Sequence, residues 1–167
     1  DEDNKEEKEE VTPIEIDQNE INDEPIVALL DGLPLENHEW IKDFLIIDDP
    51  DDWAEEYAPS DQRHGTSMAS LIVRGDMEGE ELALSRKIYC RPILKPIPNG
   101  FDGETREAIP ANVLPIDIVH RAVRRIFEPE GDQPAADPSV KIINLSIADT
   151  GSEERRVGIE VRTLREV

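Results

Sequence analysis

Short apolar runs recur along the chain from residue 26 onward, and they predict its strands. They span residues 26–30, 44–47, 87–94 and 140–147. Each run contains β-branched residues and most of them stop at turn-forming residues, which is typical of strands buried in a parallel sheet. Pro92 lies inside the third run, and because proline has no N–H to donate, strand pairing is expected to weaken there.

Two stretches between these runs have helical periodicity. Residues 65–74 place Ala69, Ile72 and Val73 on one face of a helix. Residues 113–127 are more clearly amphipathic, with an apolar stripe and a basic face that we interpret as solvated. The stripe consists of Val119, Ala122, Val123, Ile126 and Phe127. The basic residues off this stripe are Arg121, Arg124 and Arg125.

The alternation of strands and helices indicates an α/β fold, in which helices cover both faces of a parallel sheet. Residues 96–112 and 128–139 are rich in Pro, Gly and Asp and are predicted to be surface loops. Residues 1–24 hold 12 acidic and 2 basic side chains. We interpret them as a flexible acidic leader, with a pro-segment or docking tail as the alternative. Residues 25–150 form the predicted domain.

The charge of the whole chain narrows the classes of partner. The 167 residues include 40 Asp and Glu against 18 Lys and Arg, which gives a net charge of −22. Phosphates repel such a chain, so neither nucleic acid nor an anionic membrane surface is an expected partner. The single cysteine, Cys90, excludes an internal disulfide and is expected to be a small core residue. With no signal peptide visible at the start of the sequence, a cytoplasmic location is expected.

Asp31 and His64 are the leading candidates for chemistry. Asp31 follows the first predicted strand, and the carboxyl ends of parallel strands are where ligands and catalytic groups collect. His64 stands at the start of the first predicted helix. Each residue alone fits a structural role, such as a turn or a cap, but the two motifs that contain them change this interpretation.

Three segments resemble the motifs of the subtilisin-like serine peptidases. Residues 28–32 (ALLDG) resemble the aspartate motif, and residues 64–70 (HGTSMAS) resemble the histidine motif. Residues 142–148 (IINLSIA) resemble the substrate-binding strand of that family. The three occur in the family's order, and the resemblance covers roughly residues 25–150. It implies a subtilisin-like α/β fold of which this chain carries the first half.

The resemblance also implies roles for individual residues. Asp31 would be the orienting acid and His64 the general base of an Asp-His-Ser triad, and their side chains are expected within hydrogen-bonding reach. The implied substrate-binding residues are Asn144, Ser146, Ile147 and Ala148. Where the family often has Ser-Leu-Gly, this chain has Ala148 in place of glycine, which adds a methyl group near the specificity pocket.

Ser67 also lies in a Gly-Thr-Ser-Met-Ala sequence that matches the core of the family's nucleophile motif. It precedes the substrate strand instead of following it, and it lacks the proline that usually comes next. We therefore do not expect Ser67 to be the nucleophile. The family's oxyanion asparagine segment and true serine motif do not occur in the sequence, and residues 151–167 form a charged tail. Residues 1–167 alone are expected not to hydrolyse peptides.

The sequence thus predicts a serine endopeptidase acting on a peptide or protein substrate, with Asp and His supplied here. Its other expected partner is the remaining catalytic polypeptide or a partner chain, because an open strand edge needs cover. The alternative is a non-catalytic subtilase-like module that binds extended peptides or a partner protein. The carboxylates of Asp48, Asp49, Asp51 and Asp52 offer oxygen ligands to calcium. Their spacing is not that of an EF-hand, and we favour a solvated acidic turn.

Overall fold

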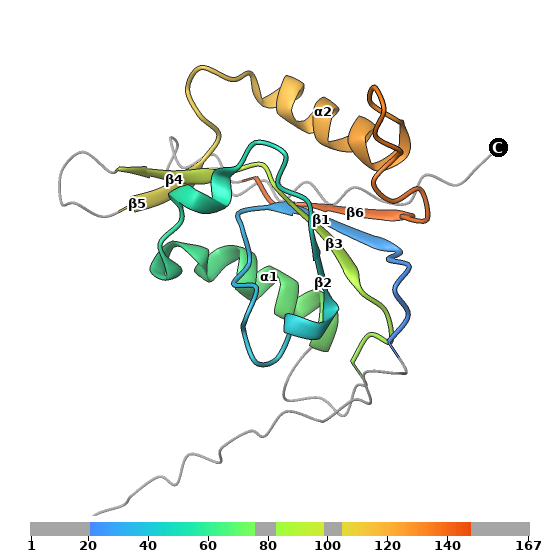
Figure 1. The fold of residues 1–167 in the computed structure, drawn as a ribbon. Helices are drawn as coiled ribbons and strands as arrows, with labels where there is room; N and C mark the ends of the chain where they lie inside the picture. The colour runs from blue at the N-terminus through green and yellow to red at the C-terminus, as the bar shows by residue number, and fades with distance from the viewer. Residues whose placement is uncertain (1–20, 76–82, 99–104, 148–167) are drawn as a thin grey trace, which may run out of the picture.

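A parallel sheet forms the centre of the computed structural model, which describes residues 21–75, 83–98 and 105–147 (Figure 1). Within these residues it has four strands, in the order β2-β3-β1-β6. They are β1 (Val27–Asp31), β2 (Leu45–Ile47), β3 (Ile88–Pro92) and β6 (Ile142–Leu145). β3 ends at Pro92, as expected from the missing N–H. All four apolar runs therefore contain a strand, which confirms the prediction.

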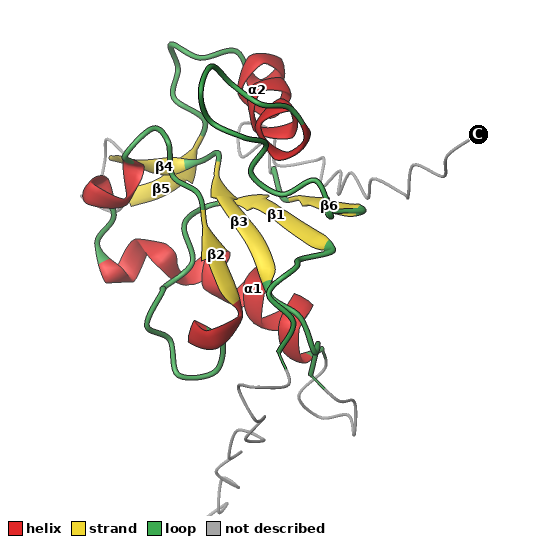
Figure 2. Cartoon of the chain, turned by 45° about the vertical axis from the view of Figure 1, so that its right-hand side comes forward, coloured by secondary structure: helices red, strands yellow, loops and turns green. Residues whose placement is uncertain are grey.

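Two helices cover opposite faces of this sheet (Figure 2). α1 (Arg63–Arg74) connects β2 to β3, and α2 (Pro115–Phe127) lies in the connection from β3 to β6. The predicted α/β architecture with helices on both faces is confirmed at this level. Among the described residues, neither helix has the length and hydropathy needed to cross a bilayer.

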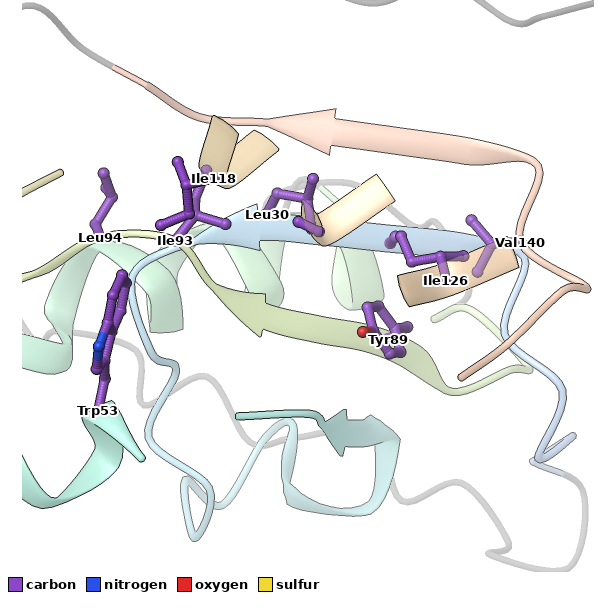
Figure 3. Packing of buried hydrophobic residues seen from close by; sticks show 10 residues of the cluster. Leu30, Trp53, Tyr89, Ile93, Leu94, Ile118, Ile126 and Val140 are labelled. Carbon is purple, nitrogen blue, oxygen red and sulfur yellow. The ribbon is translucent and has the colours of Figure 1, made fainter. Parts of the chain in front are cut away.

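Side chains of β1 alternate between two apolar clusters, one under each helix. Val27 and Leu29 belong to the cluster under α1. Ala28 and Leu30 belong to the cluster under α2, which Figure 3 shows. The α1 cluster also contains Ile41, Phe44, Ala69, Val73, Ile88 and Cys90. The α2 cluster also contains Trp53, Tyr89, Ile93, Leu94, Ile118, Ala122, Ile126 and Val140. This alternation follows from the two-residue period of a strand and explains why β1 is apolar at successive positions.

The buried stripe of α2 is shifted slightly from the predicted one. Ile118, Ala122 and Ile126 are fully buried, at successive intervals of one helical turn. Val119 and Val123 pack partly against the cluster, as predicted, but Phe127 is 41% exposed. The placement of Phe127 in the stripe was wrong, because the sheet-facing line runs through residue 118 and leaves the last residue of the helix turned toward solvent.

Part of the segment predicted as a surface loop over 96–112 is a β-hairpin instead. β4 (Lys95–Pro98) pairs antiparallel with β5 (Thr105–Ala108), apart from the main sheet. The strand β4 was not predicted because Pro96 and Pro98 are typical of loops. Prolines at alternate positions are compatible with pairing on one edge, because alternate backbone N–H groups of a strand face away from its partner.

Short 3-10 helices complete the described structure. They are η2 (Lys42–Phe44), η3 (Trp53–Glu56) and η4 (Pro59–Gln62), and η4 leads directly into α1. Contacts with the folded part begin earlier than predicted, because Ile21 packs against the α1 cluster. The N–H of Lys87 also donates to the carbonyl of Asn22. Residues 21 and 22 of the predicted acidic leader therefore contact the folded part.

Candidate active site at the carboxyl end of β1

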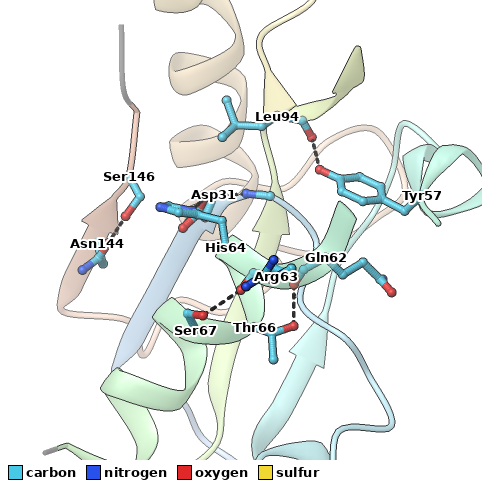
Figure 4. Close-up of polar contacts among 11 residues, drawn as sticks. Asp31, Tyr57, Gln62, Arg63, His64, Thr66, Ser67, Leu94, Asn144 and Ser146 are labelled. Carbon is cyan, nitrogen blue, oxygen red and sulfur yellow. Dashed lines mark hydrogen bonds and ion pairs between the residues drawn. The ribbon is translucent and has the colours of Figure 1, made fainter. Parts of the chain in front are cut away.

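Asp31 and His64 meet at the end of β1, as the two motifs predicted. Asp31 Oδ1 lies 2.8 Å from His64 Nδ1, within hydrogen-bonding distance (Figure 4). The same oxygen accepts the backbone N–H of Gly32 at 2.7 Å. Asp31 is fully buried as the last residue of β1, whereas His64 belongs to the first turn of α1. The expected proximity is confirmed, and it joins two residues that are far apart in the sequence.

The imidazole of His64 has two different environments. Its Nδ1 side faces the buried carboxylate, and the side chain as a whole is 55% exposed. A carboxylate partner favours the tautomer that carries the proton on Nδ1, because only that form donates to Asp31. The opposite nitrogen, Nε2, is then an unprotonated acceptor on the exposed side of the ring. This arrangement can take a proton from a group that approaches from solvent.

The pKa of Asp31 reflects a balance between burial and hydrogen bonding. Burial is the largest influence, and it raises the pKa because the charged form loses hydration. The Gly32 N–H opposes this, followed by the charge and hydrogen bond of His64, and the Ser146 hydroxyl acts in the same direction. The second oxygen, Oδ2, is buried without a hydrogen-bond partner among the described residues. Burying this carboxylate with one oxygen unpaired therefore lowers the stability of the fold.

Gly65 allows α1 to approach the aspartate motif closely. A Cβ on Gly65 would lie 2.4 Å from the carbonyl oxygen of Gly32 and 2.9 Å from the backbone of Leu33. Any side chain at residue 65 would therefore separate α1 from the end of β1. Thr66 secures the same contact, since its Oγ1 accepts the N–H of Leu35 at 2.8 Å and donates to the carbonyl of Gln62 at 2.5 Å. The His-Gly-Thr sequence thus combines the histidine with the packing that positions it.

The predicted substrate-binding residues lie beside the pair. β6 is the neighbour of β1 at the sheet edge, and Asn144 is opposite Leu29. The Ser146 N–H donates to the carbonyl of Leu30 at 3.1 Å, and its hydroxyl donates to Asn144 Oδ1 at 3.0 Å. Ile147 packs partly against the α2 cluster. Ala148 lies outside the described residues.

Ser67 is engaged elsewhere. Its hydroxyl donates to the carbonyl of Arg63 at 2.8 Å, within α1 (Figure 4). Among the described residues, no serine hydroxyl is hydrogen-bonded to His64. This contact agrees with the expectation that Ser67 is not the nucleophile.

Glu107 is a member of the site that the sequence analysis missed. It comes from β5 of the unpredicted hairpin, and its Oε1 lies only 1.7 Å from the position that a Cβ on Gly32 would occupy. Burial raises its pKa, while the Tyr57 hydroxyl lowers it and the charge of Asp31 raises it further. Tyr57 itself donates to the carbonyl of Leu94 at 2.8 Å. No local pattern marks Glu107, because its place depends on the hairpin.

The acidic turn after β2 is only partly the solvated turn that was predicted, because two of its carboxylates pair with arginines. Asp48 Oδ2 accepts the hydroxyl of Tyr89 at 2.5 Å and lies 3.5 Å from Arg125 Nε. Asp51 lies 3.3 Å from Arg121 and 3.7 Å from Arg91. No group of metal-ligating side chains forms among the residues that the structure covers. The arginine face of α2, interpreted as solvated, thus partly packs against these carboxylates.

Cys90 is buried in the α1 cluster, as expected for a small core residue. Burial, with a smaller influence from the charge of Asp31, raises the pKa of its thiol. A thiol of this kind is a poor nucleophile, because the thiolate is the reactive form. We therefore assign Cys90 to packing and not to the candidate chemistry.

Comparison with known proteins adds no relative to this picture. No family model matches the chain, and neither a curated protein nor a solved structure matches it. The functional argument accordingly depends on the motifs and on the geometry at the carboxyl end of β1.

Proposed function

We propose that this protein is a subtilisin-like serine endopeptidase in which Asp31 is the orienting acid and His64 the general base. The observation that carries the proposal is the 2.8 Å contact between the buried Asp31 carboxylate and the exposed His64 imidazole. The order of the three motifs along the chain supports it, as does the position of the pair at the carboxyl edge of a parallel sheet.

The geometry accounts for two requirements of this chemistry. A serine hydroxyl needs a base to take its proton as it attacks a carbonyl carbon, and Nε2 of His64 is the accessible nitrogen. The imidazolium that results must be stabilised, and the adjacent Asp31 carboxylate supplies the opposite charge. The proton then passes from Nε2 to the leaving amine as the acyl-enzyme forms. The serine itself would approach from the solvent side of His64.

The edge position of β6 supports a site for an extended substrate. β6 pairs with β1 on one side and ends the described sheet on the other. An edge strand offers backbone N–H and C=O groups that pair with a further strand or with an extended peptide. Asn144 lies on this strand and Ser146 directly follows it, both close to Asp31 (Figure 4). A peptide bound there would reach the base.

Covalent labelling tests the proposal on the protein expressed from its complete gene. A fluorophosphonate probe reacts with a serine that a base has activated, and mass spectrometry identifies the labelled residue. We expect labelling of the unchanged protein and a loss of labelling in His64→Ala of at least about a hundredfold, the scale of general-base catalysis. His38→Ala removes another histidine and is the matched control. Equal labelling of His64→Ala, or no labelling at all, would contradict the proposal.

The same strand edge favours a second function, namely the binding of extended peptides without cleavage. In that case Asp31 and His64 would only join α1 to the sheet. Fluorescence polarisation with labelled peptides would show binding, and the covalent probe would find no reactive serine. A reactive serine whose labelling depends on His64 would exclude this second function.

A further inference from the structure

The face of the sheet covered by α2 has a small basic pocket, whose lining includes neither Asp31 nor His64. The pocket has a volume of about 260 Å³ and lies between α2 and the turn after β2. Its basic lining comes from Arg91 of β3 and from Arg121, Arg124 and Arg125 of α2. The acidic residues that also line it are Asp51, Glu128 and Glu130. We call these four arginines and the space between them the arginine pocket.

Arg91 is the buried arginine of the arginine pocket. Its side chain is only 4% exposed, and Nε and Nη1 have no hydrogen-bond partner among the described residues. The nearest carboxylates lie 3.7 Å away at Asp51 and 4.0 Å away at Asp48. Charge-assisted hydrogen bonds between such groups are shorter, about 2.7–2.9 Å. The buried Arg91 guanidinium therefore lies near negative charge, but some of its N–H groups have no acceptor among the described residues.

The carboxylates around Arg91 are already shared with other groups. Asp48 accepts the Tyr89 hydroxyl, and the same oxygen lies 3.5 Å from Arg125. Asp51 lies 3.3 Å from Arg121 as well as near Arg91. The two carboxylates thus share three guanidinium neighbours, and most of the distances are too long for hydrogen bonds. A group with several acceptor oxygens would satisfy donors that the protein leaves unmet.

We propose that the arginine pocket binds a phosphate-type oxyanion. A tetrahedral oxyanion presents oxygens in several directions, and arginine donors from β3 and α2 converge from different elements. The volume is below the range of about 300–1,000 Å³ that is usual for sites of drug-sized ligands, so the pocket suits a single phosphoryl group. Arg124 binds Glu128 at 2.7 Å on the exposed rim and would contribute mainly long-range attraction.

The alternative is an internal ion network that only ties α2 to the turn after β2. Such a network would bind no added anion beyond the general effect of ionic strength. The two interpretations differ in whether the donors of Arg91 respond to a ligand, so Arg91 itself is the best reporter. This inference does not depend on the proposed peptidase activity.

Titration of the purified full chain with inorganic phosphate tests the proposal, with sodium chloride of equal ionic strength as the reference. We expect saturable binding by calorimetry with a dissociation constant of about 1 mM or lower. We also expect the ¹⁵N-detected Nε–H signal of Arg91 to shift with the same saturation. No saturable binding, or an Arg91 signal that does not move, would overturn the proposal.

Matched variants locate the binding without disturbing the buried arginine. Arg121 and Arg124 are about half exposed, at 51% and 58%, so their replacement by glutamine should preserve the fold. We expect R121Q/R124Q to weaken phosphate binding about tenfold, which corresponds to about 1.4 kcal/mol. Lys141→Gln removes an exposed positive charge outside the pocket and should change binding less than twofold, within the scatter of surface substitutions. Equal weakening by both changes would indicate nonspecific attraction and would contradict the site.

The source of the phosphoryl group follows from two further titrations. A phosphoserine peptide and adenosine monophosphate carry the same group on different bodies. Tighter binding of either one than of inorganic phosphate supports the site and names its ligand class. Equal affinity for all three supports a site for the free oxyanion. Binding of the peptide through its unphosphorylated form would overturn the proposal.

Discussion

Asp31 and Arg91 are the two charged residues that are buried in the described structure. Burial removes water from both charges, and the two residues differ in the hydrogen bonds that replace it. They lie on adjacent strands, with Leu30 opposite Arg91 and Asp31 opposite Pro92. Asp31 accepts hydrogen bonds at 2.7 and 2.8 Å from groups that its own motif and α1 supply. Arg91 has ion-pair partners only at 3.7 and 4.0 Å. The first charge is held by short contacts within the fold, whereas the second is left with unused donors.

The difference comes from how each helix is joined to the sheet. On the α1 side, Gly65 brings the helix backbone against the backbone of Gly32 and Leu33, so a short polar side chain such as Asp31 reaches its partner. On the α2 side, long arginine side chains cross the space between helix and sheet and meet carboxylates from a turn. Close backbone packing yields a rigid contact, and long side chains leave room for a ligand.

The largest effect on stability is expected from Gly65→Ala, which disrupts the close contact between α1 and the Gly32 backbone. Alanine favours a helix more than glycine does, yet its Cβ would lie 2.4 Å from the Gly32 carbonyl oxygen. The backbone has to move apart, so we expect the free energy of unfolding to fall by about 3 kcal/mol. Urea denaturation measures it, with Ser67→Ala on the same helix as the control. An unchanged or increased stability would refute the close-contact explanation.

Asp48→Ala is the corresponding change on the α2 side. It leaves the Tyr89 hydroxyl without its acceptor and removes the carboxylate nearest to Arg125. We expect a loss of about 2 kcal/mol in the free energy of unfolding, because buried donors are left unpaired. Glu55→Ala removes the same charge from an exposed position and serves as the control. If both variants lost equal stability, the polar network under α2 would have no special role.

Asp31→Asn should increase the free energy of unfolding, by less than the two preceding substitutions decrease it. Burial raises the pKa of Asp31 above 3.8, so the folded state binds this proton more tightly than the unfolded state. Stability contributed by Asp31 is therefore lost as the pH rises from the unfolded value through the raised folded value. Above that window we expect Asp31→Asn to be more stable by about 1 kcal/mol, at the cost of the proposed activity.

Denaturation at several pH values tests this sign. The difference between Asp31→Asn and the unchanged protein should shrink as the pH falls below the folded pKa of Asp31. The exposed Asp117→Asn is the control, because it removes a solvated carboxylate. A variant that is less stable at neutral pH would show that the contact with His64 outweighs burial.

Ser67→Ala should have the smallest effect on the proposed activity. The Ser67 hydroxyl is bound to the carbonyl of Arg63 and does not contact His64. We expect peptide hydrolysis or probe labelling by the complete gene product to stay within about twofold of the unchanged protein, as for a surface substitution. A loss on the scale of about 10⁶, typical of a missing serine nucleophile, would make Ser67 the nucleophile and overturn our assignment.

The sequence revealed the parts of the molecule that local patterns encode. Continuous apolar runs marked the strands, and the aspartate and histidine motifs placed Asp31 and His64 together because parallel strands align their carboxyl ends. The hairpin was missed because Pro96 and Pro98 are typical of loops, and Glu107 was missed with it. The pairing of Asp48 with Arg125 could not be predicted, since it depends on where α2 crosses the sheet.

The tautomer of His64 is the property that tests the proposed acid–base pair most directly. ¹⁵N NMR of the imidazole distinguishes a protonated nitrogen from an unprotonated one in the neutral ring. We predict that Nδ1 carries the proton and Nε2 is free in the unchanged protein, and that Asp31→Ala shifts the balance toward Nε2–H. A neutral His64 that carries its proton on Nε2 in the unchanged protein would contradict the assignment of His64 as the general base.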